Sequence, residues 1–161
     1  MKSSYKYLLP KTCYKKTIRK YNPGIRIFST FLEFIDHTIF VQNTDVLEKL
    51  FQLKKNKTLT ERDIAMFHSL VRMYTPRKNY PLEEKRVLNL KSRIKKLYSK
   101  SNTGVKLRVS SKGWLLLSDI IYQKIEHISL LIEKYIILTK RTSLSHKDIP
   151  LLFTTHVDFL L

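Results

Sequence analysis

The sequence is poor in cysteine, glycine and proline. Its 161 residues include 1 cysteine, 3 glycines and 5 prolines. The single cysteine, Cys13, excludes an internal disulfide framework and suits a reducing compartment. The scarcity of glycine and proline excludes a low-complexity chain, and a hydrophobic content of 43% is too high for a disordered basic tail. The composition therefore indicates a chain that folds around a core.

Acidic residues are also scarce. Asp and Glu number 13 against 31 Lys and Arg, which gives a formal net charge of +18. Repulsion among so many positive charges disfavours a compact state unless a polyanion neutralises them. The charge balance therefore predicts nucleic acid or another anionic surface as the partner.

Uninterrupted apolar runs and catalytic motifs are missing as well. The start, MKSSYKYLLPK, has no apolar stretch long enough for a secretory signal. The most apolar segment, residues 114–138, is broken by charged residues and indicates a buried amphipathic helix with no membrane span. The 5 histidines show no metal-ligand spacing, and no Cys or Ser stands in a nucleophile motif. We therefore predict no enzyme activity, no metal and no cofactor.

One signal occurs twice. The stretch KKNKTLTERDIAMF, residues 54–67, returns in altered form as LTKRTSLSHKDIPLLF, residues 138–153. In each copy a basic, hydroxyl-rich run meets a Leu, then Thr or Ser, and three residues later an Asp followed by Ile. Thr60 and Ser145 are typical helix N-caps, with Asp63 and Asp148 placed to reach back to them and to favour the positive end of the helix dipole. Each copy predicts a basic loop that leads into a capped helix.

The first half of the chain predicts three helices. A short helix over residues 10–21 has Pro10 in its first turn, an inward face of Cys13 or Tyr14 with Ile18 and Tyr21, and Asn-Pro-Gly as its stop. After an extended piece, Ile25 to Ile27, a long helix runs from about Phe31 to Lys55. A capping box of Thr30 and Glu33 is expected to begin it. Its apolar stripe comprises Phe31, Phe34, Ile35, Thr38, Ile39, Gln42, Val46, Leu50 and Leu53. A third helix follows from about Glu61 to Tyr74, with Ile64, Phe67, Val71 and Tyr74 facing inward.

The second half repeats the series. Residues 76–81, which carry two prolines, form the expected linker. A helix over about 82–100, an extended Leu107 to Val109, a long helix from Ser110 or Ser111, and a last helix from Ser145 follow. The expected inner face of the first of these helices comprises Val87, Leu90, Ile94 and Leu97. That of the long helix comprises Trp114, Leu117, Ile121, Ile125, Ile128, Leu131 or Ile132, Tyr135 and Leu138.

This order of a helix, an extended trio, a long helix, a basic loop and a helix resembles the histone fold. The most similar stretches are Lys57 to Ile64 and Arg141 to Ile149. The resemblance implies an all-α protein of two tandem histone folds, residues 10–75 and 82–161, after a short basic tail over 1–9. The wide apolar face of a long helix is not covered by two short helices, so the two folds are expected to clasp each other in an intramolecular handshake pair.

The doubled sequence therefore looks like a histone doublet. Residues 14–25 are similar to the outer two-B core histone. The second half fits its two-A partner by position, and its spacing fits the central tetramer histones equally well. Fused pairs of this kind are known from large DNA viruses of the Marseillevirus group, which implies a viral protein located in the virion, the host nucleus or a viral factory. The implied partners are double-stranded DNA, a second histone pair or fused doublet, and further copies of this chain.

The resemblance also implies where DNA binds. The extended trio of each half should pair with the loop of the other, Arg26–Ile27 with Ser143–Leu144 and Arg108–Val109 with Thr58–Leu59. Arg26 and Arg108 would then enter the minor groove or contact flanking phosphates, without reading base sequence. The full set of expected DNA-binding residues is Lys15, Arg19, Arg26, Lys55, Lys57, Thr58, Lys95, Arg108, Lys140, Arg141, Thr142 and Ser143.

The histone resemblance also implies an Arg–Asp clamp, in which an arginine of the basic loop pairs with the aspartate of the helix cap. Arg141 precedes Asp148 by seven residues, the spacing of that clamp, whereas Asn56 takes the matching place before Asp63. The clamp is therefore expected in the second half and missing in the first. Pro150 removes a backbone hydrogen bond early in the last helix, so that helix should be kinked or start late.

Two other functions remain open at this point. A histone-fold subunit of a transcription factor would act as a protein–protein module, although a net charge of +18 argues against it. A basic helical protein that binds structured RNA agrees with the charge equally well. Nuclease protection of duplex DNA discriminates between these alternatives and a DNA-packaging histone.

Overall fold

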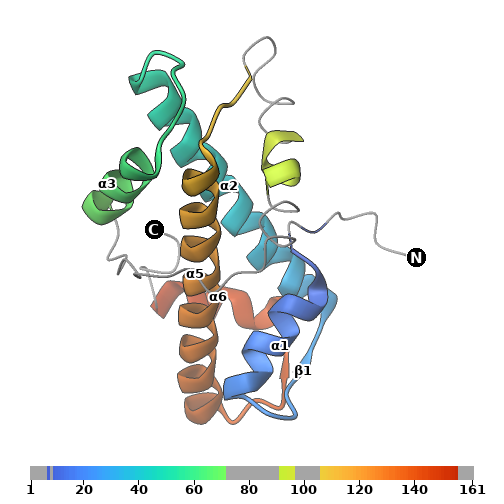
Figure 1. The fold of residues 1–161 in the computed structure, drawn as a ribbon. Helices are drawn as coiled ribbons and strands as arrows, with labels where there is room; N and C mark the ends of the chain where they lie inside the picture. Colours follow the sequence, from blue (N-terminus) through green and yellow to red (C-terminus); the bar gives the residue numbers. More distant parts are fainter. Residues whose placement is uncertain (1–6, 8, 72–90, 97–105, 156–161) are drawn as a thin grey trace. The chain divides into compact units, whose positions relative to one another are not determined.

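The structure, a computed structural model, describes residues 7, 9–71, 91–96 and 106–155. The described chain is mostly helical and has one small two-stranded sheet (Figure 1). It forms two compact units, Met1–Ile39 with Gln123–Leu161, and Phe40–Tyr122. Each unit therefore takes residues from both sequence halves.

The first unit holds both ends of the described chain. It contains α1 (Lys11–Tyr21), β1 (Arg26–Ile27) and the start of α2 (Ser29–Leu53). It also contains the latter part of α5 (Ser111–Thr139), β2 (Ser143–Leu144), the 3-10 turn η1 (His146–Asp148) and α6 (Ile149–Thr155). The second unit holds the rest of α2, α3 (Glu61–Val71), the helical residues 91–96 and the start of α5.

Helix α1 begins and ends where its sequence dictates. Pro10 occupies the N-cap position, where its lack of an N–H costs nothing. Asn22 is the C-cap, and Gly24 holds φ +80°, a left-handed conformation that glycine adopts without strain. Tyr14 and Ile18 are the buried residues of α1, which settles the choice between Cys13 and Tyr14 in favour of Tyr14.

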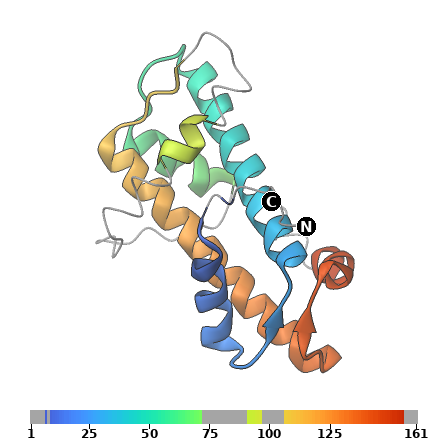
Figure 2. The same cartoon turned by 90° about the vertical axis from the view of Figure 1, so that its right-hand side faces the viewer.

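The two extended segments pair as predicted. Strand β1 lies parallel to β2, with Arg26 opposite Ser143 and Ile27 opposite Leu144 (Figure 2). In the second unit, an isolated parallel bridge joins Leu59 to Val109. Both predicted pairings between the sequence halves are therefore confirmed.

Each unit has an apolar core to which both halves contribute. In the second unit Ile64 of α3 packs with Leu116 and Ile120 of α5, and Val109 lies against this cluster. In the first unit the buried side chains come from α1, β1, α2, α5, β2 and α6: Tyr14, Ile18, Ile27, Phe31, Leu32, Ile35, Ile39, Ile125, Ile128, Leu131, Ile132, Tyr135, Leu144 and Leu152. An apolar face supplied by one half is thus removed from water by residues of the other half.

The expected helix faces are correct except at their ends. Leu53 is 78% exposed and Leu138 is 83% exposed, so both predictions of burial are wrong. Each leucine lies at or next to the last residue of a long helix, where the chain turns into a basic loop. The expected Thr30–Glu33 capping box is also wrong. Helix α2 begins at Ser29, so Thr30 lies inside its first turn, and the Phe28 carbonyl accepts the first helical hydrogen bonds, from Phe31 and Leu32.

The remaining helix starts follow the sequence closely. Ser110 is the cap of α5, because its hydroxyl accepts a hydrogen bond from the Gly113 N–H at 3.0 Å. Ser145 and Asp148 form a capping box around η1, and α6 starts only at Ile149. Pro150 therefore lies in the first turn of α6, where its missing N–H has no helical partner to lose. The predicted late start of the last helix is confirmed.

Several expectations lie outside the described residues. They are the tail over 1–6, Tyr74, the linker over 76–81, and most of the helix expected over 82–100, of which only residues 91–96 are described as helical. The side chains of Gln42, Phe67 and Val71 are also outside the described set. Ile94, within the described stretch, is buried as predicted.

Candidate nucleic-acid interface

Each unit carries one basic edge where a loop of one half meets the extended segment of the other. We define the first edge as Arg26, Lys140, Arg141, Thr142 and Ser143. Its backbone is fixed by two hydrogen bonds, from the Arg26 N–H to the Thr142 carbonyl (3.2 Å) and from the Phe28 N–H to the Leu144 carbonyl (2.9 Å).

The second edge comprises Lys55, Lys57, Thr58 and Arg108. Here the Leu59 N–H donates to the Arg108 carbonyl and the Ser110 N–H donates to the Leu59 carbonyl, both at 2.9 Å. The second of these bonds matches the one from Phe28 to Leu144 at the first edge. The repeat in the sequence is therefore also a repeat in backbone geometry.

The two edges are alike in charge and exposure. Three cations stand on each, and all six are exposed: Arg26, Lys140, Arg141, Lys55, Lys57 and Arg108. Thr58 and Thr142 are also exposed, whereas Ser143 is half-buried. The paired apolar residues beside them, Ile27 with Leu144 and Leu59 with Val109, are buried or half-buried. This alternation places cations and hydroxyls outward and anchors them on a buried pair.

The predicted clamp at the first edge is confirmed. The Arg141 Nε donates to Asp148 Oδ1 at 2.7 Å, and Asp148 is only 2% exposed. The Tyr135 hydroxyl donates to the same oxygen at 2.7 Å, and the Ser145 N–H donates to the other at 2.8 Å. Burial by itself would raise the pKa of Asp148, but these three hydrogen bonds hold it below its ordinary value. For Tyr135, burial and then its bond to Asp148 raise the pKa to about 12.

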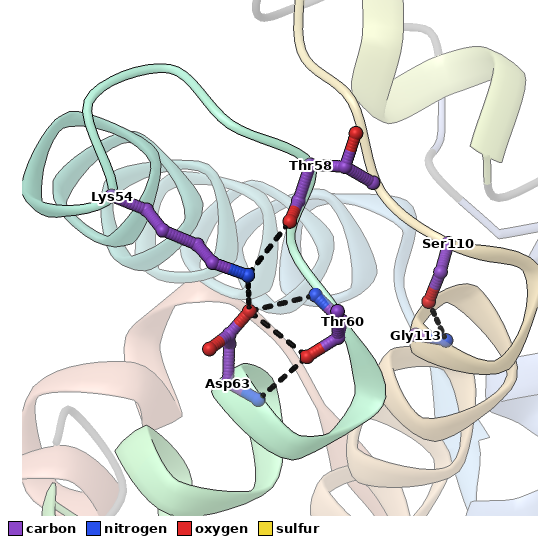
Figure 3. Close-up of polar contacts among 6 residues, drawn as sticks. All are labelled: Lys54, Thr58, Thr60, Asp63, Ser110 and Gly113. Atoms are coloured by element: carbon purple, nitrogen blue, oxygen red, sulfur yellow. Dashed lines mark hydrogen bonds and ion pairs between the residues drawn. The ribbon is translucent and has the colours of Figure 1, made fainter.

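At the second edge, Asn56 stands in the place of the clamp arginine as expected, and Asp63 pairs with Lys54, a cation that the sequence analysis did not single out. Figure 3 shows the Lys54 ammonium beside the Asp63 carboxylate, at 2.5 Å, with a second bond to the Thr58 carbonyl at 2.9 Å. The Thr60 N–H and hydroxyl donate to the same carboxylate oxygen at 2.8 and 3.0 Å. Burial would raise the pKa of Asp63, yet the bonds from Lys54 and Thr60 lower it. Asn56, in the place expected for the clamp, holds φ 60°, a conformation that asparagine tolerates.

Both basic loops contain lysines with left-handed backbone. Lys55 and Lys140 each have φ 55°. This region is unfavourable for residues with a Cβ atom and usually holds glycine at a helix C-terminus. Lysine at both positions therefore has a backbone conformation that glycine would adopt with less strain.

The other expected DNA-binding residues lie on the helices. Arg19 of α1 is exposed, and its Nε donates to the Ile25 carbonyl at 3.5 Å, next to the first edge. Lys15 is half-buried on α1, and Lys95 is exposed in the helical stretch 91–96. Neither Lys15 nor Lys95 is tied to an edge by a hydrogen bond or ion pair identified among the described residues. The structure therefore places nine of the twelve expected residues on one edge or the other, with Arg19 next to the first edge, and leaves Lys15 and Lys95 apart.

Sequence reasoning missed a buried carboxylate under the N-terminal segment. Asp36 of α2 is 0% exposed and accepts a short hydrogen bond from the Tyr14 hydroxyl and another from the Leu9 N–H at 3.2 Å. Leu9 itself is buried, so these contacts fasten the segment before α1 to α2. Asp36 follows Ile35 in the largely apolar stretch FLEFIDHTIF, residues 31–40, and a carboxylate in that stretch was the available signal.

The described residues hold no sign of two other kinds of site. No group of three or more His, Cys, Asp or Glu side chains there is arranged to hold a metal ion. None of the described helices has the length and apolar character needed to cross a membrane.

Comparison with known proteins found no match to this chain. Neither protein-family models nor curated protein sequences match this chain. Function must therefore be inferred from the chain's own residues.

Proposed function

We propose that this chain is a fused histone-like pair, two tandem histone folds in an intramolecular handshake, that packages duplex DNA without reading its sequence. One observation carries the proposal. The extended segment of each half pairs with the basic loop of the other half, once between Arg26 and Ser143 and once between Leu59 and Val109. This reciprocal pairing is what the histone resemblance implies.

The chemistry of the two edges suits the backbone of DNA. Guanidinium groups of Arg26 and Arg108 can enter a narrow minor groove or contact the phosphates that flank it. Lys55, Lys57 and Lys140 supply charge to phosphates, and the hydroxyls of the loop threonines donate hydrogen bonds to them. None of these groups meets a base edge in a way that distinguishes sequences, so affinity follows from charge and from how easily the duplex bends.

Two basic edges on one chain suit a polyanionic ligand such as duplex DNA. Each edge presents three exposed cations on a paired-segment support, so each edge by itself is suited to contact a minor groove and its flanking phosphates. As the resemblance implies, a nucleosome-like particle would also contain a second histone pair, a second fused doublet or further copies of this chain. Nothing in this function requires catalysis.

Nuclease digestion tests the proposal directly. The chain is mixed with long duplex DNA, alone and with a candidate second histone pair, and digested to completion. We expect a protected fragment of defined length. A smear, or preference for structured RNA in competition, would instead support the basic RNA-binding alternative, and absence of any affinity would support a protein–protein module.

Salt dependence of binding supplies a quantitative check. The slope of log K against log salt decreases in magnitude by about 0.9 for each phosphate that the protein no longer neutralises. The double variant Arg26→Ala/Arg108→Ala should therefore reduce the slope by about 2. Lys49→Ala is the matched control, because the Lys49 ammonium is 2.9 Å from Asp45 on the same helix and belongs to neither edge. An equal effect of both variants would contradict the proposal.

A further inference from the structure

The two long helices begin in the same way but with very different residues. Ser110 precedes α5 and caps it through the Gly113 N–H (Figure 3). Phe28 occupies the equivalent place before α2. Its carbonyl accepts the first helical bonds, and its N–H pairs with Leu144 as that of Ser110 pairs with Leu59. Phenylalanine has no side-chain acceptor and cannot cap a helix.

Phe28 does not serve the core either. Its side chain is exposed, at 40%, whereas the neighbouring Ile27 and Phe31 are 7% and 0% exposed. Phe28 therefore departs both from the preference for a polar residue at a helix N-cap and from the preference for burying a large aromatic side chain. Departures of this kind in natural proteins are expected at functional or strained sites.

Among the described residues, the Phe28 ring makes an identified contact with Arg26 of the first edge. The guanidinium carbon of Arg26 lies 5.0 Å from the centroid of the Phe28 ring, within the range of a cation–π interaction. Arginine stacks on aromatic faces with its planar guanidinium, and its N–H groups stay available at the rim of the stack. The Phe28 ring therefore restricts the guanidinium without using up its hydrogen-bond donors.

We propose that Phe28 is a positioning residue for DNA binding, which holds the Arg26 guanidinium in the orientation that meets the duplex. The inference rests on the proposed function. Arginine loses rotamer freedom when it is fixed in a complex, and a stack formed beforehand reduces that loss. Arg108 has Ser110 two residues on in place of an aromatic ring, so the equivalent position gives it no such stack, and no other aromatic stack on Arg108 is found among the described residues. The two edges are therefore unequal, and Arg26 contributes more to affinity than Arg108.

Phe28→Ser is the decisive variant because it should move stability and affinity in opposite directions. It places at α2 the same cap residue that α5 has, so the melting temperature should rise by about 2 to 4 °C. It also removes the stack, so DNA affinity should fall by about two- to fivefold. A purely structural role for Phe28 would lower both quantities. Phe28→Tyr retains an aromatic face and should restore affinity.

Two controls isolate the stack. Phe28→Leu keeps apolar volume without adding a cap and should lose affinity as the serine variant does. In an Arg26→Ala background, Phe28→Ser should change affinity no further. In nuclear magnetic resonance spectra of the free protein, the Arg26 side-chain protons should show an upfield ring-current shift that both Phe28→Ser and Phe28→Leu abolish.

The outcomes separate this inference from the proposed function. If the unmodified chain protects DNA but Phe28→Ser and Phe28→Leu bind it equally well, the inference is overturned and the proposed function stands. Loss of affinity that persists undiminished in the Arg26→Ala background would also overturn it. If the unmodified chain binds no DNA, both fail together.

Discussion

At the scale of single residues, two equivalent aspartates of the repeat are paired with cations from different sequence positions. Asp63 and Asp148 occupy equivalent places in the repeat. Each carboxylate accepts a backbone hydrogen bond at the start of a helix and pairs with a cation from the preceding basic segment. Asp148 takes its cation from Arg141, seven residues earlier, whereas Asp63 takes it from Lys54, nine residues earlier. The function of the position is preserved while the donor moves to another residue.

Loss of the buried Asp148 carboxylate should lower the free energy of unfolding more than loss of the Asp63 carboxylate. We expect Asp148→Asn to lower the free energy of unfolding by about 2 kcal/mol, because the buried Tyr135 hydroxyl and the Ser145 N–H lose a charged acceptor. Urea unfolding followed by circular dichroism measures it. Asp45→Asn is the matched control, since Asp45 pairs with Lys49 on the surface and its change should cost below about 0.5 kcal/mol. Equal costs for both variants would show that the buried cluster has no special role.

Acid should remove the contribution of Asp148. Its pKa is lower in the folded state than in the unfolded state, so the stabilisation is fully present above the unfolded value, near pH 4. It is then lost as the pH falls through the folded value. The difference in unfolding free energy between the unmodified chain and Asp148→Asn should therefore be constant from about pH 7 to about pH 5 and shrink below about pH 4. A difference that does not change with pH would contradict this account.

At the scale of elements, the start of α5 has no room for a side chain at Gly113. A Cβ atom there would lie 2.8 Å from Val109 Cγ1 and 3.3 Å from Ile64 Cδ1. Val109 is held by its pairing with Leu59, so it cannot move away freely. The glycine thus lets the helix approach the paired segment closely.

Gly113→Ala should therefore destabilise the chain although alanine favours a helix. The clash costs roughly 1–3 kcal/mol and the gain in helix propensity is about 1 kcal/mol, so we expect a net loss of about 1 kcal/mol. Thermal unfolding measures it. Combining it with Val109→Ala should remove the clash, so the two costs should be less than additive. Full additivity would show that Val109 is not the obstacle.

Lys140, which follows α5, has a left-handed backbone conformation. Its replacement by glycine should stabilise the chain, whereas Gly113→Ala should destabilise it. Lys140→Gly should raise the free energy of unfolding by roughly 0.5 kcal/mol, because glycine adopts φ 55° without strain. The same change should reduce the slope of log K against log salt for DNA by about 0.9, since one phosphate is no longer neutralised. Lys140→Arg should leave that slope unchanged. A stabilised variant with an unaltered slope would exclude Lys140 from the interface.

Elements with local signals were predictable from the sequence. The Pro10 start and Asn-Pro-Gly stop of α1, the Ser145 cap and the late start of α6 follow from short stretches of residues, whereas the register of both pairings was an implication of the histone resemblance. The errors arose where tertiary contacts decide. Leu53 and Leu138 fit the apolar repeat of their helices, but no other described element packs over the helix ends where they lie. The ion pair between Lys54 and Asp63 depends on how the chain folds back after α2. Phe28 was not singled out from the sequence, although its partner Arg26 lies two residues earlier, the spacing that places two side chains on one face of an extended segment.

At the scale of the whole molecule, each compact unit draws on both sequence halves. The first unit joins α1 and β1 of one half to β2 and α6 of the other, and the second joins α3 of one half to the start of α5 of the other. Helices α2 and α5 each supply residues to both units. A half of the chain alone therefore lacks part of the core of both units.

This interleaving predicts the behaviour of a divided chain. Cut after Lys78, within the expected linker, the fragments 1–78 and 79–161 should each be poorly helical or aggregated, because their apolar helix faces have no cover. Mixed in equal amounts, they should regain the helical circular dichroism of the intact chain and sediment as a one-to-one complex. The same mixture made with Ile27→Asp should fail to assemble, since Ile27 is 7% exposed and pairs with Leu144 of the other fragment. Two fragments that fold separately, each as a helical monomer with no affinity for the other, would refute the interleaved architecture and, with it, the basis for a shared DNA-binding edge.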